Sequence, residues 1–314
     1  MTNGPALTPP VHPFSGATQG LALEDADAVF FAARHGTPYL NIDNEVFAET
    51  GNCLRAAIAE EGRWTDHWDF DFNGELLGPD GAFKLLDAGD LDTMSQDGPG
   101  NRQKITDFTK QIIAAGAVPI MVGGDDSVPI PFLAAFDGIG PITILQIDSH
   151  IDWREERRGE PMGFSSTMRR ASEMSHVERI VQAGIRGKGS ARIGEVEFAR
   201  NWGAKIVTAR TIHHNGIGAV LDEIPDGSQV VMTLDCDGLD PSAIPAIAAI
   251  TPGGLTYTHI IELIHGVSAK AKLVGFDLIE FIPESDLGGI GAITAARIIS
   301  NVIGTLANAQ DAAV

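Results

Sequence analysis

Short apolar runs alternate with segments of helical periodicity along most of the chain. Runs of this length, bounded by turn-forming residues, are typical of buried strands, and the alternation predicts a mostly parallel sheet with helices on both faces. The predicted strands comprise residues 28–33, 83–90, 118–122, 141–147, 180–185, 205–208, 229–234 and 273–276. The predicted helices comprise residues 52–60, 102–115, 128–136, 168–174, 191–202, 217–224, 257–269 and 291–307.

No linker rich in Pro, Gly or Ser interrupts this alternation, so residues 21–314 are expected to form a single domain. Residues 1–20 are rich in Pro, Thr and Gly and lack the basic and apolar segments of a secretory signal. They are expected to form an N-terminal arm. We find no apolar stretch near the roughly 20 residues that a membrane span needs, so no membrane partner is expected.

Polar side chains break the apolar pattern where two predicted strands end. Asp148, His150 and Asp152 follow one strand, and Asp235 and Asp237 follow another. Residues two apart on an extended strand share a face, and the carboxyl ends of parallel strands are where open α/β sheets place their sites. As an alternative, such acidic residues cap the next helix. Four carboxylates and one imidazole fit a pair of hard or borderline divalent ions better than a structural zinc site.

Composition narrows the possible partners. With 42 acidic and 22 basic residues the formal net charge is −20, and no basic stripe is present, which excludes a typical nucleic-acid-binding surface. The two cysteines, Cys53 and Cys236, are too few for a disulfide framework and predict a reduced, cytoplasmic protein. Cys236 lies between two candidate ligands but points to the opposite face, so we expect it in the core.

Four separated motifs resemble those of the ureohydrolase family, which includes arginases, agmatinases and guanidinobutyrases. The resemblance covers about residues 28–307. The motifs stand here as Gly123-Gly124-Asp125-Asp126-Ser127, Asp148-Ser149-His150-Ile151-Asp152, Thr233-Leu234-Asp235-Cys236-Asp237-Gly238-Leu239-Asp240-Pro241, and Glu280 within Gly275-Phe276-Asp277-Leu278-Ile279-Glu280.

This resemblance implies a three-layer α-β-α arginase-type fold with an eight-stranded, mostly parallel sheet. It also implies a homo-oligomer, a trimer or hexamer, that holds two Mn²⁺ or alternatively two Ni²⁺ per chain. Activated water would attack a guanidinium carbon and release urea and an amine, and Glu280 would hold the guanidinium. The implied metal ligands are Asp148 and Asp235 as bridges, His150 and Asp237 for one ion, and Asp152 and Asp126 for the other.

Two departures from the family pattern bear on the activity. Asp126 stands where the family has a metal-binding His; a carboxylate can still bind and favours oxygen-preferring ions, or it does not reach and one ion is weakly held. The loop from Trp153 to Arg170 lacks the His that shuttles a proton in agmatinase-like members. Alignment on Gly163 puts Met162 at that position, and alignment on the Arg169-Arg170 pair puts Phe164 there. Neither side chain transfers protons.

The function expected from these observations is hydrolysis of a small cationic guanidino compound other than arginine. Met162, Phe164 and Trp153 are expected to line the substrate pocket, and Glu280, Asp148 and Asp235 to be catalytic. One alternative is a non-catalytic or weakly active paralogue that serves as a subunit of a hetero-oligomer. Another is hydrolysis of a different C–N bond, such as a formimino or amide group, by the same pair of ions.

Overall fold

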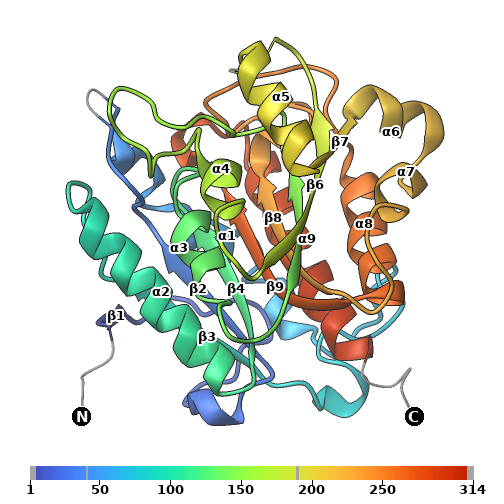
Figure 1. Cartoon of the computed structure of the whole chain (residues 1–314). Helices are drawn as coiled ribbons and strands as arrows, with labels where there is room; N and C mark the ends of the chain where they lie inside the picture. Colours follow the sequence, from blue (N-terminus) through green and yellow to red (C-terminus); the bar gives the residue numbers. More distant parts are fainter. Residues whose placement is uncertain (1–4, 40–41, 189–190, 310–314) are drawn as a thin grey trace.

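The strands form one nine-stranded sheet in the order β1-β3-β2-β4-β9-β8-β5-β6-β7 in the computed structural model, which describes residues 5–39, 42–188 and 191–309 (Figure 1). All eight predicted strands are present, and neighbours among them pair in parallel. The bounds are β1 (Leu7–Thr8), β2 (Ala28–Ala33), β3 (Leu85–Leu91), β4 (Val118–Gly123), β5 (Ile142–Ile147), β6 (Val177–Ile185), β7 (Lys205–Thr208), β8 (Gln229–Asp235) and β9 (Lys272–Ile279).

The ninth strand corrects the expected count of eight. Leu7 and Thr8, within the predicted N-terminal arm, pair antiparallel with Leu91 and Asp90 at the edge of the sheet. A two-residue strand has no periodicity that a sequence pattern can reveal. Phe14, later in the arm, is buried, and its ring centre lies 4.8 Å from that of Phe30. The described part of the arm therefore packs on the sheet.

Helices cover both faces, as predicted, because successive residues of each strand point to opposite sides. Phe30 packs in one core cluster with residues of α1, α8 and α9, whereas Phe31 packs in the other with residues of α2, α3 and α5. Among the α-helices of the described residues, only α6 was not predicted. The bounds are α1 (Thr50–Ala57), α2 (Gly98–Ala114), α3 (Pro129–Ala134), α4 (Thr167–Ala171), α5 (Ile193–Trp202), α6 (Ala209–Asn215), α7 (Gly218–Leu221), α8 (Tyr257–Lys270) and α9 (Ile290–Ala309).

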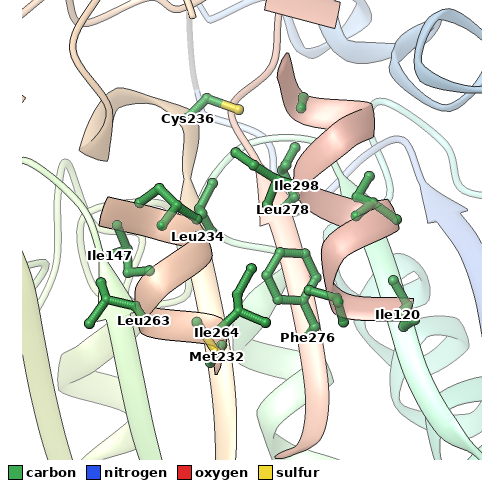
Figure 2. Close-up of a cluster of buried hydrophobic side chains, with 14 of the residues drawn as sticks. Ile120, Ile147, Met232, Leu234, Cys236, Leu263, Ile264, Phe276, Leu278 and Ile298 are labelled. Atoms are coloured by element: carbon green, nitrogen blue, oxygen red, sulfur yellow. The ribbon is translucent and has the colours of Figure 1, made fainter. Parts of the chain in front are cut away.

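The larger core cluster lies between the central strands and helices α8 and α9. Figure 2 shows Met232 and Leu234 of β8 beside Phe276 and Leu278 of β9, facing the apolar side chains of both helices. Cys236 is fully buried in this cluster, which confirms its predicted place in the core. The bulky apolar packing behind the strand ends gives the residues that follow them a rigid support.

Among the described residues one helix, α9, is long enough and apolar enough to cross a membrane, judged by length and composition alone. A stretch of this kind was not predicted from the sequence. Of its apolar window, 72% is buried inside the fold. Burial on this scale is that of a core helix, and in this structure α9 packs against α1, α8 and β9.

The fold brings the polar motifs together at one edge of the sheet. β4, β9, β8 and β5 are consecutive neighbours in the sheet and run parallel. Their carboxyl ends therefore lie side by side, and the loop after each strand carries one of the four motifs. Segments more than 150 residues apart in the chain, such as those of Asp126 and Glu280, meet in this way.

Candidate metal and substrate site

A cavity of about 530 Å³ opens at the carboxyl ends of the four central strands. Phe47, Ile247 and Ile282 contribute apolar walls, and Asp43, Arg154 and Arg157 also line it. A cavity of this volume suits a small-molecule ligand. The predicted site residues that line it are Asp126, His150, Asp152, Asp235, Asp237, Glu280 and Phe164.

Two groups of ligand-type side chains lie within this site. The first consists of Asp148, His150 and Asp237, and the second of Asp126, Asp148 and Asp152, with the ligand atoms of each group within 4.8 Å of one another. Asp148 belongs to both groups. Two groups that share one carboxylate are the arrangement expected for two neighbouring ions bridged by that carboxylate.

Backbone N–H groups in the loops after β5 and β8 donate hydrogen bonds to acidic side chains of the loop after β8. The Ser149 N–H donates to Asp237 Oδ1 at 3.0 Å, and the Asp237 N–H donates to Asp235 Oδ1 at 2.8 Å. The His150 ring Nδ1 lies 3.1 Å from Asp237 Oδ2 and 3.4 Å from Asp148 Oδ1. These contacts hold Asp235, which is in neither ligand group, beside the others and at the cavity wall.

Asp126 is buried and reaches the second ligand group despite its short side chain. Its backbone is held at two points: its N–H donates to Glu280 Oε1 at 3.0 Å, and its carbonyl accepts from the Thr167 hydroxyl. Its side-chain oxygen Oδ2 is buried without a hydrogen-bond partner. A buried polar atom with no partner is costly, and a bound cation would remove that cost.

Burial and mutual repulsion dominate the electrostatics of the carboxylates. Burial first, and then the charges of Asp152 and Asp148, raise the pKa of Asp126 well above its usual range. Burial and the neighbouring carboxylates act in the same way on the pKa values of Asp148 and Asp235. A site with several buried carboxylates, oxygen donors and one imidazole therefore fits divalent cations, whose charge would favour the ionised carboxylates.

At His150 the surroundings favour the charged form of the side chain. Burial alone would lower the pKa of its ring, but the hydrogen bond and charge of Asp237, with other nearby carboxylates, raise that pKa to about 9. The same interaction acts on Asp237. Burial alone would raise the pKa of its carboxyl group, but the hydrogen bond and charge of His150 lower that pKa below its usual range. A cation at this position is thus favoured by the surrounding charge, whether it is a proton on His150 or a metal ion bound to it.

Two site residues have unusual backbone conformations. Asp152 and Glu280 have φ values of 53° and 62°, in the left-handed region that non-glycine residues rarely adopt. The Glu280 N–H donates to the Gly124 carbonyl at 2.9 Å, which ties the loop after β9 to the loop after β4. Such conformations cost free energy and persist only where the surrounding structure fixes them. They are found most often at functional sites.

Glu280 lies at the cavity wall among the other acidic side chains. Burial first, and then the Asp125 charge, raise the pKa of Glu280 to about 8. Asp125 itself accepts from the Ser127 hydroxyl at 2.5 Å and does not belong to either ligand group. A buried carboxylate at a cavity wall, whose ionised form is disfavoured by burial and by neighbouring acidic groups, is a feature expected for a site that receives a cationic ligand.

The three residues predicted to line the substrate pocket lie in different places. Phe164 lines the cavity, with its ring centre 4.7 Å from that of Tyr39 and 4.9 Å from the Arg157 guanidinium carbon. Met162 instead lines a separate surface groove with residues of α2 and α3. Trp153 is 1% exposed and packs in the core beside α5. Of these three residues, the structure therefore brings only Phe164 to the cavity.

Arg186 is a site residue whose role the sequence did not reveal. Its Nη2 donates to the carbonyls of Asp237 and Leu239 at 2.6 and 3.1 Å, and to that of Thr251 at 2.7 Å. The side chain thereby fastens the loop after β8, which carries a candidate ligand. The only signal in the sequence was its place in a Gly-Ile-Arg segment, since backbone carbonyl partners leave no residue pattern.

The chain is similar in sequence and in fold to known proteins. A guanidino acid hydrolase from human mitochondria is 27% identical over 71% of this chain and 64% of that protein. A mitochondrial agmatinase of Gallus gallus is 28% identical over 72% of this chain and 67% of that protein. A proclavaminate amidino hydrolase structure from Streptomyces clavuligerus superposes with a TM-score of 0.78 at 24% identity, over 97% of this chain and 98% of that one.

The structural likeness shows that the three-layer fold is of the arginase type, as the sequence motifs predicted. The sequence profile described as "Arginase family" matches residues 52–304, which include all the candidate ligands and Glu280. We conclude that this chain belongs to the arginase family.

Proposed function

We propose that this protein is a metal-dependent hydrolase that cleaves a small guanidino compound other than arginine into urea and an amine. The observation that carries the proposal is one cavity lined both by members of two ligand groups and by Glu280. Guanidino compounds are what the named relatives act on. Two observations therefore support the proposal: membership of the arginase family, and a cavity lined by candidate metal ligands and by Glu280.

The metal ligands that we propose are those expected from the sequence. Asp148, His150 and Asp237 would hold one divalent ion, and Asp126, Asp148 and Asp152 the other, with Asp235 as a second bridging carboxylate. Oxygen donors predominate, which favours Mn²⁺, with Ni²⁺ as the alternative. Bound in this place, two such ions supply a nucleophile from water at neutral pH.

Glu280 is proposed to bind the guanidinium group of the substrate. A carboxylate matches the planar guanidinium through charge-assisted, bidentate hydrogen bonds. The Asp126 N–H donates to one oxygen of Glu280 at 3.0 Å and so orients the carboxylate. A bound guanidinium would favour the ionised form of Glu280, which burial disfavours in the free protein, so binding and ionisation support each other.

Phe164 is proposed to form an apolar wall of the same pocket. It cannot move a proton, so the leaving amine must take its proton from another group or from solvent. This observation favours a second candidate function, a weakly active paralogue that works as a subunit of a hetero-oligomer. Assembly as a homotrimer, a homohexamer or a complex with a paralogue remains a prediction, and light scattering of the purified chain with and without metal would test it.

The decisive experiment measures urea. The wild-type chain, loaded with Mn²⁺ or Ni²⁺, is incubated with guanidine, methylguanidine, agmatine and guanidinobutyrate, and urea and bound metal are quantified. Urea from at least one compound, with two ions per chain, supports the proposal. Two bound ions and no urea would refute the proposed substrate class, and no bound metal with no urea would support the paralogue.

The variant Glu280→Gln tests the role of Glu280. Glutamine keeps an oxygen for the Asp126 N–H but loses the negative charge. A charged hydrogen bond contributes about 1.5 to 3 kcal/mol, so kcat/KM is expected to fall about 10- to 100-fold while the metal content stays unchanged. Equal kcat/KM in the variant and the wild type would remove Glu280 from the mechanism.

A further inference from the structure

A row of buried polar side chains crosses the sheet directly beneath the metal-ligand groups. Gln146 of β5 pairs in register with Gln182 of β6 on one side and with Thr233 of β8 on the other. Gln146 and Gln182 are 1% and 0% exposed. Full burial of two amides inside apolar strands is costly unless every polar atom is used, so their hydrogen bonds need to be accounted for.

The hydrogen bonds form a continuous chain that starts in the core and ends on two candidate ligands. The Trp153 indole Nε1–H donates to Gln182 Oε1 at 2.9 Å, and Gln182 Nε2 donates to Gln146 Oε1 and to the Ile151 carbonyl. Gln146 Nε2 then donates to Asp148 Oδ2 at 2.7 Å and to Asp152 Oδ2 at 2.8 Å. Both amides use their nitrogen and oxygen.

The direction of this chain is determined by its first member. An indole N–H can only donate, so the atom of Gln182 that faces Trp153 must be its oxygen. The nitrogen of Gln182 then faces Gln146, whose oxygen must accept, and the nitrogen of Gln146 is left to face the two carboxylates. A reversed Gln146 would place its oxygen against two carboxylates and its nitrogen against a nitrogen.

We propose that Gln146 is the residue that positions the carboxylates of Asp148 and Asp152, two of the proposed metal ligands, and that Gln182 and Trp153 determine its orientation. One amide group bridges Asp148 and Asp152 and thereby sets their separation before an ion binds. Trp153, expected from the sequence to contact substrate, would act from the core instead.

This inference rests on the proposed function, because it treats Asp148 and Asp152 as metal ligands. Its test uses the full-length chain stripped of metal, with Mn²⁺ titrated and the free ion followed by electron paramagnetic resonance. Gln146→Leu removes the donor at similar volume. Gln229→Leu is the matched control, since Gln229 also lies on a central strand and donates only to backbone carbonyls at the opposite end of the sheet.

Loss of an outer hydrogen-bond partner typically weakens metal binding 10- to 100-fold, and we expect a loss of about that size for Gln146→Leu with wild-type affinity in Gln229→Leu. Trp153→Phe keeps an aromatic ring beside α5 but removes the donor, and we expect an intermediate loss. Thermal unfolding of each metal-free variant separates a loss of Mn²⁺ affinity from a folding defect. Mn²⁺ affinities are compared only between chains that unfold cooperatively.

Wild-type Mn²⁺ affinity in a folded Gln146→Leu chain would overturn the inference while leaving the proposed function in place. Wild-type affinity in Trp153→Phe would overturn the part assigned to Trp153. Should Gln146→Leu not fold, the Trp153→Phe result alone decides, because the side chains of Gln182 and Gln146 separate the Trp153 donor from the ligands along the hydrogen-bond chain. Absence of binding of both Mn²⁺ and Ni²⁺ by the wild-type chain would instead refute the proposed function itself.

Discussion

Replacing Asp126 with Asn is expected to have opposite effects on stability and on metal binding. The change is isosteric and removes one ionisable group from a cluster of buried carboxylates. In the metal-free protein the carboxylates repel one another, so the loss of one favours folding. In the metal-bound protein the same change removes a ligand. A residue that merely packed in the core would lower stability without this dependence on metal.

The pH dependence follows from the sign of the pKa shift. Burial first, and then neighbouring charges, raise the pKa of Asp126 from 3.8, so the native state holds its proton more tightly than the unfolded state. The contribution of Asp126 to the free energy of unfolding is fully present below the pKa of the group in the unfolded chain. It is lost as the pH rises toward the pKa in the native state, at about 1.4 kcal/mol per pH unit. The variant lacks this loss. Its stability relative to wild type should therefore rise as the pH increases above 3.8, the pKa of the group in the unfolded chain.

The metal effect follows from linkage. An ion present at 100 times its dissociation constant stabilises the native state by about 2.7 kcal/mol, whereas a 100-fold weaker site gains about 0.4 kcal/mol from the same concentration. Urea unfolding followed by tryptophan fluorescence, in EDTA and in Mn²⁺, measures both effects. Asp222→Asn, the same change at an exposed carboxylate, is the control. Wild-type Mn²⁺ stabilisation in Asp126→Asn, or a stability difference independent of pH, would refute the reasoning.

Three further predictions concern other parts of the molecule. Arg55→Met removes a fully buried guanidinium that lies 2.8 Å from Asp87 and 2.6 Å from Asp90, and it should cost about 3 to 5 kcal/mol in urea unfolding; a loss below about 1 kcal/mol would contradict this. Asp277→Asn should gain stability relative to wild type as pH rises from 4 toward 8, because burial raises the pKa of Asp277 to about 8 and the wild-type protein loses stability over that window; parallel pH profiles would exclude it. Gly238→Ala would place a Cβ 2.8 Å from the backbone nitrogen of Asp148. This contact should push the ends of β5 and β8 apart and weaken Mn²⁺ binding. Unchanged Mn²⁺ binding by calorimetry would argue against a tight contact there.

The pattern of residues was sufficient for the sheet and for most of the site. Eight strands and all but one of the helices follow from apolar runs and helical periodicity, because burial on a sheet face or a helix face imposes a repeat on the sequence. Asp148, His150 and Asp152 could be assigned to one face of a strand end for the same reason. β1 escaped this reasoning because two residues carry no repeat.

The destinations of Trp153, Met162 and Phe164 required the tertiary structure. All three lie in one loop of mixed charge and apolar bulk, and a loop has no periodicity that separates core from cavity. The indole of Trp153 is held in the core by Gln182, which is a partner from a neighbouring strand. Met162 faces α2 and α3, and Phe164 meets Tyr39 from a segment more than 100 residues earlier.

The sequence by itself determined the family, the edge of the sheet that carries the site, and the identity of the candidate ligands, because these depend on residue type and on spacing within single segments. Only the tertiary structure decided whether Asp126 reaches its neighbours and how Gln146 is oriented. Those features depend on distances between different strands. Short side chains such as that of Asp126 bind a shared ion only if the strand ends are within a few ångströms, and that separation is set by the packing of the whole sheet.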